Sequence, residues 1–191
     1  MTPPHPPALA STLANVLNPF SIFTALFALA AFAQSPVPEA LLYLLMELFA
    51  AAVVAGYVFL MRRRRRVGDF WISARAERLV PAIFLLSAFV GLLAALWLLE
   101  APSVLLRMTL SMGLAAAAVA AITLLWKASA HAAVAGHAAV AGPLVLGLPG
   151  LVFVLAFPLV LYARVGPWAH TLPQALAGSA IGAVFAILFL A

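Results

Sequence analysis

Long apolar runs separated by short polar turns make up most of the chain. A helix needs roughly 20 apolar residues to cross the hydrocarbon core of a bilayer, and several runs reach that length. Proline and glycine clusters between the runs indicate where helices end. We therefore expect helices at about 39–61, 79–99 and 104–126, from near 129 to about 142, at about 151–163, and from 171 to the C-terminus.

The first apolar run, at about 9–33, differs from the others because Asn15, Asn18 and Pro19 interrupt it. Such a run either spans the membrane with a kink at Pro19 or lies partly in the interface, and we favour a span. The proline-rich segment 1–8 is expected to be a flexible tail. With this run included, the pattern predicts six or seven transmembrane helices.

The composition supports a membrane protein and excludes several other classes. Hydrophobic residues make up 67% of the chain and charged residues only 8%, whereas charged residues are about a quarter of a soluble domain. No loop is long enough to fold alone, so residues 1–191 form one integral-membrane domain, an all-α polytopic bundle. Cysteine is absent, which excludes disulfides and thiolate metal sites. So hydrophobic a chain does not suit nucleic-acid binding.

The distribution of positive charge predicts the orientation of the bundle. Five of the ten Lys and Arg residues form one run at 62–66, directly after the helix at 39–61. Basic clusters mark the cytoplasmic ends of transmembrane helices. We therefore predict a multi-pass protein of the cell membrane whose polar residues gather on the cytoplasmic face.

Counting the crossings brings three polar segments to one side of the membrane. The chain crosses twice between Arg78 and Lys127, and twice more between His131 and Arg164, so segments 62–78, 127–131 and 164–174 share a face. The candidate functional residues in these segments are Arg75, Arg78, Lys127, Ser129, His131, Arg164, His170 and Gln174.

These residue types suit the handling of a phosphate group. Arginines bind phosphate through two parallel hydrogen bonds, and two histidines can divide the roles of nucleophile and acid because imidazole titrates near neutrality. The helix starts expected at Ser129 and Thr171 would add backbone N–H groups for an anion. The sequence therefore predicts phosphoryl transfer from a lipid phosphate in the interface.

The spacing of these residues resembles that of the type 2 phosphatidic acid phosphatase superfamily, whose motifs are Lys-x6-Arg-Pro, Pro-Ser-Gly-His and Ser-Arg-x5-His-x3-Asp. Arg164, His170 and Gln174 match the third motif in spacing, and the segment Ala-Ser-Ala-His at 128–131 matches the second in part. In the first motif Arg78 stands for the arginine, while Trp71 and Leu79 replace lysine and proline. The resemblance covers roughly residues 60–185, a phosphatase-like core.

The resemblance implies a helical bundle with its site at one membrane face and no need for a metal or other cofactor. His170 would attack phosphorus and become phosphohistidine, and His131 would protonate the leaving alkoxide. Arg164, Arg78 and Arg75 would stabilise the phosphoryl oxygens, and Lys127 would replace the missing lysine. The implied partners are the membrane and a lipid phosphate or diphosphate, such as phosphatidate, phosphatidylglycerol phosphate or a polyprenyl phosphate.

The main departure from the resemblance is Gln174 where the superfamily has aspartate. An amide oxygen can accept the N–H of His170 and so orient the ring, but it cannot stabilise the positive charge on it. The alternative function is therefore a catalytically silent protein that binds or transports a lipid phosphate on the same scaffold.

Two further polar residues lie within apolar runs. His131 and His137 open a duplicated six-residue segment, and an offset of six turns about 240° on a helix, so the pair cannot share a metal and His137 is expected to pack. Glu47 lies 14 residues before the polar end of its helix, roughly 20 Å along the axis. It should face the bundle. It either partners a cation of the site or is a hydrogen-bonded packing residue, and its depth favours packing.

Overall fold

The computed structural model describes residues 6–69, 72, 77, 79–166 and 168–191, so Arg75, Arg78 and most of the predicted tail 1–8 lie outside the described residues. The described residues are helical apart from short connections and an isolated bridge between Val165 and His170, which confirms the all-α class. The helices are α1 Ala8–Val16, α2 Pro19–Gln34, α3 Val37–Arg63, α4 Leu79–Leu98, α5 Ser103–Thr123, α6 Ala130–Leu146, the 3-10 turn η2 Leu148–Gly150, α7 Leu151–Arg164 and α8 Leu172–Leu190.

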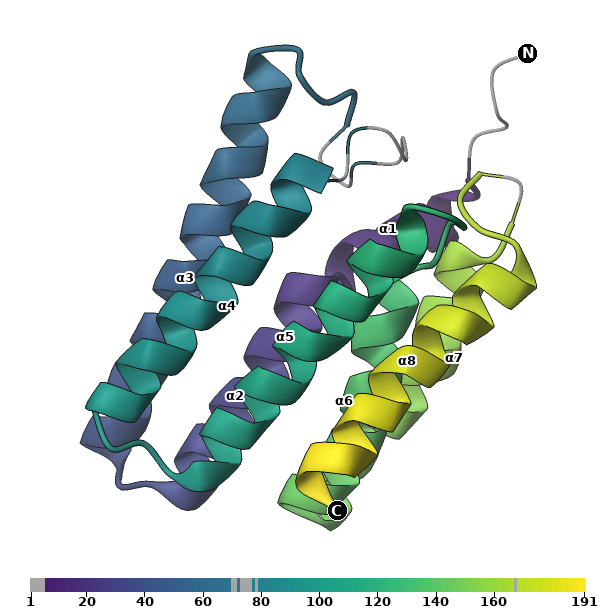
Figure 1. The fold of residues 1–191 in the computed structure, drawn as a ribbon. Coiled ribbons are helices and arrows are strands. Elements are labelled where there is room, and N and C mark those ends of the chain that lie inside the picture. The colour runs from purple at the N-terminus through teal and green to yellow at the C-terminus, as the bar shows by residue number, and fades with distance from the viewer. Residues whose placement is uncertain (1–5, 70–71, 73–76, 78, 167) are drawn as a thin grey trace.

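The helices from α2 onward run up and down, so their connections gather at two ends (Figure 1). The α3–α4, α5–α6 and α7–α8 connections lie at the upper end, and the α2–α3, α4–α5 and α6–α7 connections lie at the lower end. The described parts of the three polar segments therefore share one end of the bundle, as the count of crossings predicts.

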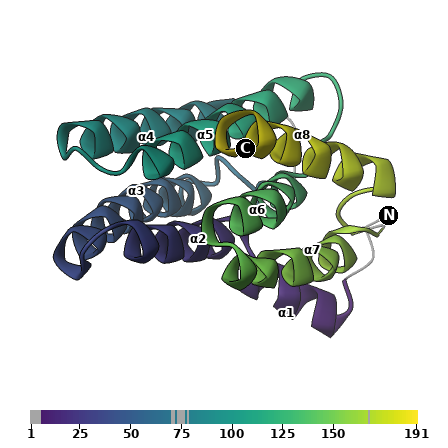
Figure 2. The same cartoon turned by 90° about the horizontal axis from the view of Figure 1, so that it is seen from below.

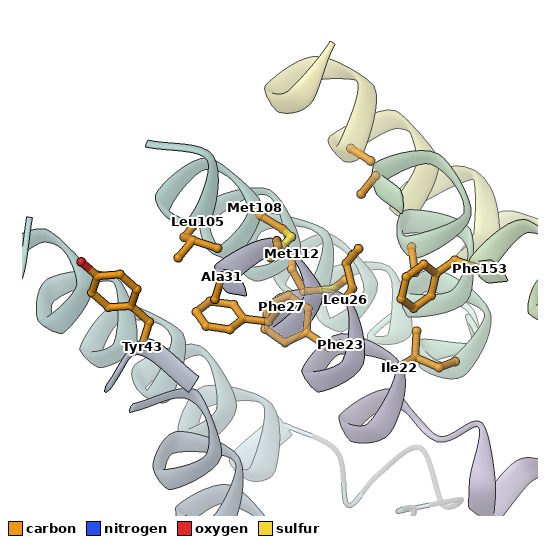
Figure 3. Close-up of a cluster of buried hydrophobic side chains, with 14 of the residues drawn as sticks. Ile22, Phe23, Leu26, Phe27, Ala31, Tyr43, Leu105, Met108, Met112 and Phe153 are labelled. Atoms are coloured by element: carbon orange, nitrogen blue, oxygen red, sulfur yellow. The ribbon is translucent and has the colours of Figure 1, made fainter. Parts of the chain in front are cut away.

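Helix α6 lies at the centre, with α5 and α8 on one side and α2 and α7 on the other (Figure 2). Helices α3 and α4 pack on each other and join the rest of the bundle through α2 and α5. A buried apolar cluster fills the middle, with Phe23 and Phe27 of α2 beside Met108 and Met112 of α5 (Figure 3). The centre is thus closely packed, while the α3–α4 pair flanks it.

Glycines let α6 and α8 approach closely. A Cβ on Gly182 of α8 would overlap the carbonyl oxygen of Ala133, and one on Gly178 would overlap that of Ser129. Gly136 of α6 meets the backbone of Ser179 in the same way. Inside the bilayer the hydrophobic effect does not drive apolar helices together. Close contact between their backbones supplies the packing energy instead.

The first apolar run is two helices rather than one kinked helix. The axes of α1 and α2 differ by 42°. Asn18 separates them and caps α2, because its side chain accepts the N–H of Ser21 at 3.0 Å while the Ser21 hydroxyl accepts the N–H of Asn18 at 3.2 Å. Pro19 occupies the first helical position, where its missing N–H costs nothing.

The structure does not confirm six or seven spans. Four helices, α3, α4, α5 and α8, are long and apolar enough to cross a membrane, and the bent α1–α2 pair raises the number to five. Helix α6 has 17 residues, about 25 Å, and α7 has 14, both short of a full hydrocarbon core. The expected break at 142–143 is wrong, because α6 continues through Pro143 and ends before Gly147, whose φ is 65°.

Candidate functional site

The connection between α7 and α8 folds back on itself and brings the two ends of the Arg-x5-His segment together. Arg164 closes α7, and its carbonyl oxygen accepts the backbone N–H of His170 at 3.1 Å. The carbonyl of His170 accepts the N–H of Gly166 at 2.9 Å. A Cβ on Gly166 would collide with the Trp168 ring, so a larger residue there would require this ring to move. The spacing of six residues is thus closed by backbone hydrogen bonds.

Two contacts join this turn to the connection between α5 and α6. The Lys127 ammonium donates to the carbonyl oxygen of Ala169 at 2.8 Å, directly before His170. The backbone N–H of Ser129 donates to the carbonyl of Gln174 at 3.3 Å. Lys127, expected to bind phosphate, therefore also fixes the position of the turn that carries His170.

Ser129 and Gln174 act as helix caps. Ser129 is fully buried, and its hydroxyl accepts the N–H of Ala132 at 3.3 Å, which confirms it as the cap of α6. The Oε1 atom of Gln174 accepts the backbone N–H of Thr171 at 3.1 Å at the start of α8. The amide oxygen expected to orient the His170 ring therefore binds the backbone one residue further on.

Three of the predicted residues line one cavity of about 910 Å³: His131 from α6, Arg164 from α7 and His170 from the turn after it. Both histidines are almost completely buried, at 5% and 4% exposed. Apolar side chains of α2, α3, α4 and α5 form most of the remaining wall. Lys127, Ser129 and Gln174 are not among the lining residues, and Arg75 and Arg78 are outside the described residues.

The arrangement suits an amphiphilic ligand. Two imidazoles and a guanidinium can hold an anionic group, and their interactions with it are stronger in a low-dielectric cavity than in water. The apolar wall can hold a hydrocarbon chain attached to that anion. Ligand cavities of a few hundred to about 1,000 Å³ are typical for small molecules.

Glu47 is buried and accepts a hydrogen bond from the Thr24 hydroxyl, as expected of a hydrogen-bonded packing residue, and it also lines the same cavity. Helix α3 has 27 residues, whereas α2, which contacts Glu47 through Thr24, begins only five residues before that threonine. A residue deep in α3 is therefore close to the start of α2.

His137 has the packing role that was expected. It is fully buried, and its Nε2 atom lies 2.7 Å from the Ser111 hydroxyl on α5. That hydroxyl donates to the carbonyl of Met108 at 2.9 Å, so Nε2–H of His137 is the donor to Ser111. Among the described residues, no three His, Asp or Glu side chains lie close enough together to hold a metal ion.

No protein-family model, curated protein or solved structure matches this chain.

Proposed function

We propose that the protein is a lipid phosphatase or phosphotransferase embedded in the cell membrane, with its site on the cytoplasmic face. Its substrate would be the phosphate ester or pyrophosphate of a lipid of the phosphatidate, phosphatidylglycerol phosphate or polyprenyl phosphate class. The observation that carries the proposal is the cavity of about 910 Å³ in which His131, Arg164 and His170 meet a long apolar wall. A phosphate with a hydrocarbon chain matches both parts of that cavity.

The reaction proceeds in two steps through His170. In the first, a ring nitrogen of His170 bonds to phosphorus while the bond from phosphorus to the lipid oxygen breaks, and His131 donates a proton to that oxygen. In the second, His131 removes a proton from water or another acceptor, whose oxygen attacks phosphorus and releases His170. Arg164 stabilises the negative charge on the phosphoryl oxygens in both steps.

The remaining predicted residues support these steps. Lys127 and Ser129 hold the turn of His170 against the start of α6 through Ala169 and Gln174. Arg75 and Arg78, which the resemblance assigns to the phosphoryl oxygens, would add to the charge of Arg164. Gln174 contributes no negative charge, so the positive charge on His170 is stabilised less well and the reaction is slower than with aspartate.

A second candidate function is binding of a lipid phosphate without catalysis. The contact that favours it is the one between Gln174 and Thr171, since the amide oxygen at the position of the catalytic carboxylate is used to cap α8. Binding needs the cavity and the arginine but not an oriented nucleophile.

The test is phosphate release by the purified protein in detergent. The native protein, His170→Ala and a matched control in the N-terminal segment, His5→Ala, are compared. Each is assayed on a panel of phosphatidate, phosphatidylglycerol phosphate and polyprenyl mono- and diphosphates. Catalysis through phosphohistidine predicts release that is abolished in His170→Ala and retained in His5→Ala. It also predicts an acid-labile label on the protein from a radioactive phosphate ester. No release from any lipid, even by Gln174→Asp, overturns the enzyme proposal and favours the binding protein.

A further inference from the structure

The cavity contains a second polar group, the carboxyl of Glu47, which the proposed reaction does not use. Glu47 lines the cavity from α3 and is only 3% exposed. Its neighbours along α3 that line the cavity are Ala50, Ala51 and Val54, so the carboxyl interrupts an apolar wall. An ionisable residue inside an apolar helix is costly and marks a functional position by default.

Among the described residues, one oxygen atom of the Glu47 carboxyl accepts a hydrogen bond and the other does not. The Thr24 hydroxyl on α2 donates to Oε1 of Glu47 at 2.8 Å. Within the described part of the chain, Oε2 is buried and has no hydrogen-bond partner. Leaving a buried polar atom unsatisfied costs about 1–3 kcal/mol. A ligand that supplies the missing partner would recover that cost.

In the proposed site, the Glu47 carboxyl would lie beside the hydrocarbon chain of the ligand rather than beside its phosphate. Phe20 of α2 lines the same cavity, and Thr24 follows it by one helical turn, about 6 Å deeper along the helix. Glu47 is therefore set back along the apolar wall from the start of α2.

We propose that Glu47, held by Thr24, is a second polar subsite that binds a hydroxyl group carried on the hydrophobic part of the ligand. A hydroxyl suits Oε2 because it both donates and accepts, so it pairs with the carboxylate and with the carboxylic acid alike. The inference deepens the proposed function, since it takes the ligand to be a lipid phosphate. It makes Glu47 a determinant of specificity for hydroxylated lipid phosphates over those with plain hydrocarbon chains.

The experiment compares dodecyl phosphate with a series in which one hydroxyl is moved along the chain. Phosphate release is measured for the hydrolysable esters, and binding is measured separately for the corresponding non-hydrolysable phosphonates. The variants are Glu47→Leu, which has a similar size but no polar atom, and Glu47→Gln, which can still accept from Thr24 and donate into the cavity. Glu39→Leu is the matched control, since Glu39 is an exposed carboxylate at the start of the same helix.

One hydroxyl position should be preferred over the plain chain by about tenfold in binding and in kcat/KM. Glu47→Leu should abolish this preference and leave the plain chain unaffected, while Glu47→Gln and Glu39→Leu should keep it. The Leu variant should fold, because the Thr24 hydroxyl can turn to a carbonyl of its own helix.

The two measurements separate the possible failures. Hydrolysis without any hydroxyl preference, or a preference that survives in Glu47→Leu, overturns the subsite and leaves the proposed function standing. A hydroxyl preference in phosphonate binding without hydrolysis supports the subsite and removes the catalytic proposal. Failure to bind any phosphonate overturns both.

Discussion

The centre of the bundle and the α3–α4 pair are built in different ways. Helix α6 contacts α2, α5, α7 and α8 and meets α8 through glycines that allow backbone contact, whereas α3 and α4 bury a smaller share of their apolar spans than α5 and α8 do. The centre carries His131, Arg164 and His170, and the pair contributes apolar wall and Glu47. On the proposed function, the closely packed half would hold the groups that do the chemistry, and the flanking half would select the chain that lies beside them.

Removing the second histidine of the central half should have the largest effect. His131→Ala should lower kcat by about 10²–10⁴-fold on a lipid phosphate, the usual loss of a general acid. The loss should be much smaller on p-nitrophenyl phosphate, whose leaving group needs no proton. Phosphate release from both substrates by both proteins gives the comparison. An equal loss on the two would show that His131 does not act as the acid.

A methyl group placed between α6 and α8 should break the packing of the centre. In Gly182→Ala the new Cβ overlaps the carbonyl of Ala133, and backbone atoms cannot move aside at low cost. Overpacking of this kind costs about 1–3 kcal/mol of unfolding free energy. Gly91→Ala on α4 is the control, because a Cβ there has open space and alanine favours the helix by up to about 1 kcal/mol. Thermal unfolding in detergent measures both, and equal midpoints would contradict the contrast.

The sequence predicted the helices of the central half better than it predicted how many helices span the membrane. Ser129 carries a local capping signal, and α6 begins after it as expected. Asn18 and Pro19 were expected only to kink a single span, whereas α2 begins there with Asn18 as its cap. Pro143 is also a helix-breaking signal, yet α6 continues through it. A proline removes one hydrogen bond, and whether a helix tolerates this depends on its tertiary contacts, here with Phe153 and Gly150 beside Gly142. No local pattern records those contacts.

The features of the candidate site also divide into those that the sequence predicted and those that it did not. The spacing between Arg164 and His170 placed these two residues together, and the count of crossings added His131. Glu47 was expected to be a hydrogen-bonded packing residue, and its bond with Thr24 agrees, but no local pattern showed that the cavity extends as far as Glu47. Glu47 lines the cavity because of how α2 and α3 are offset along their axes. Packing between the helices sets this offset, and the period of either sequence does not record it. The capping contact of Gln174 was missed although the Thr-x-x-Gln spacing from Thr171 is a capping-box signal.

A larger side chain on the α4 wall should change the choice of chain and leave the chemistry unchanged. Ala88 lines the cavity from α4, so Ala88→Phe fills part of the space along the chain. We expect kcat/KM for a long-chain lipid phosphate to fall by about tenfold, the scale of a few methylene groups that lose their place. Hydrolysis of p-nitrophenyl phosphate, which has no chain, should be unchanged. An equal loss of activity on both substrates would mean that the α4 wall affects the chemistry as well as the choice of chain.

The smallest expected effect concerns the turn between α4 and α5, at the end of the bundle opposite the site. Glu100 has φ 52° and lies after α4, where the N–H of Ala101 donates to the carbonyl of Leu96 at 2.9 Å, a helix end that favours glycine. Glu100→Gly should raise the unfolding midpoint by about 1–3 °C, because relief of the left-handed strain exceeds the entropy gained by the unfolded chain. Glu39→Gly, at a right-handed helical position in α3, should lower the midpoint instead. Activity should be unchanged in Glu100→Gly, since the turn lies far from the three connections that carry the site. A fall in the midpoint of Glu100→Gly would show that contacts of its carboxylate outweigh the backbone strain.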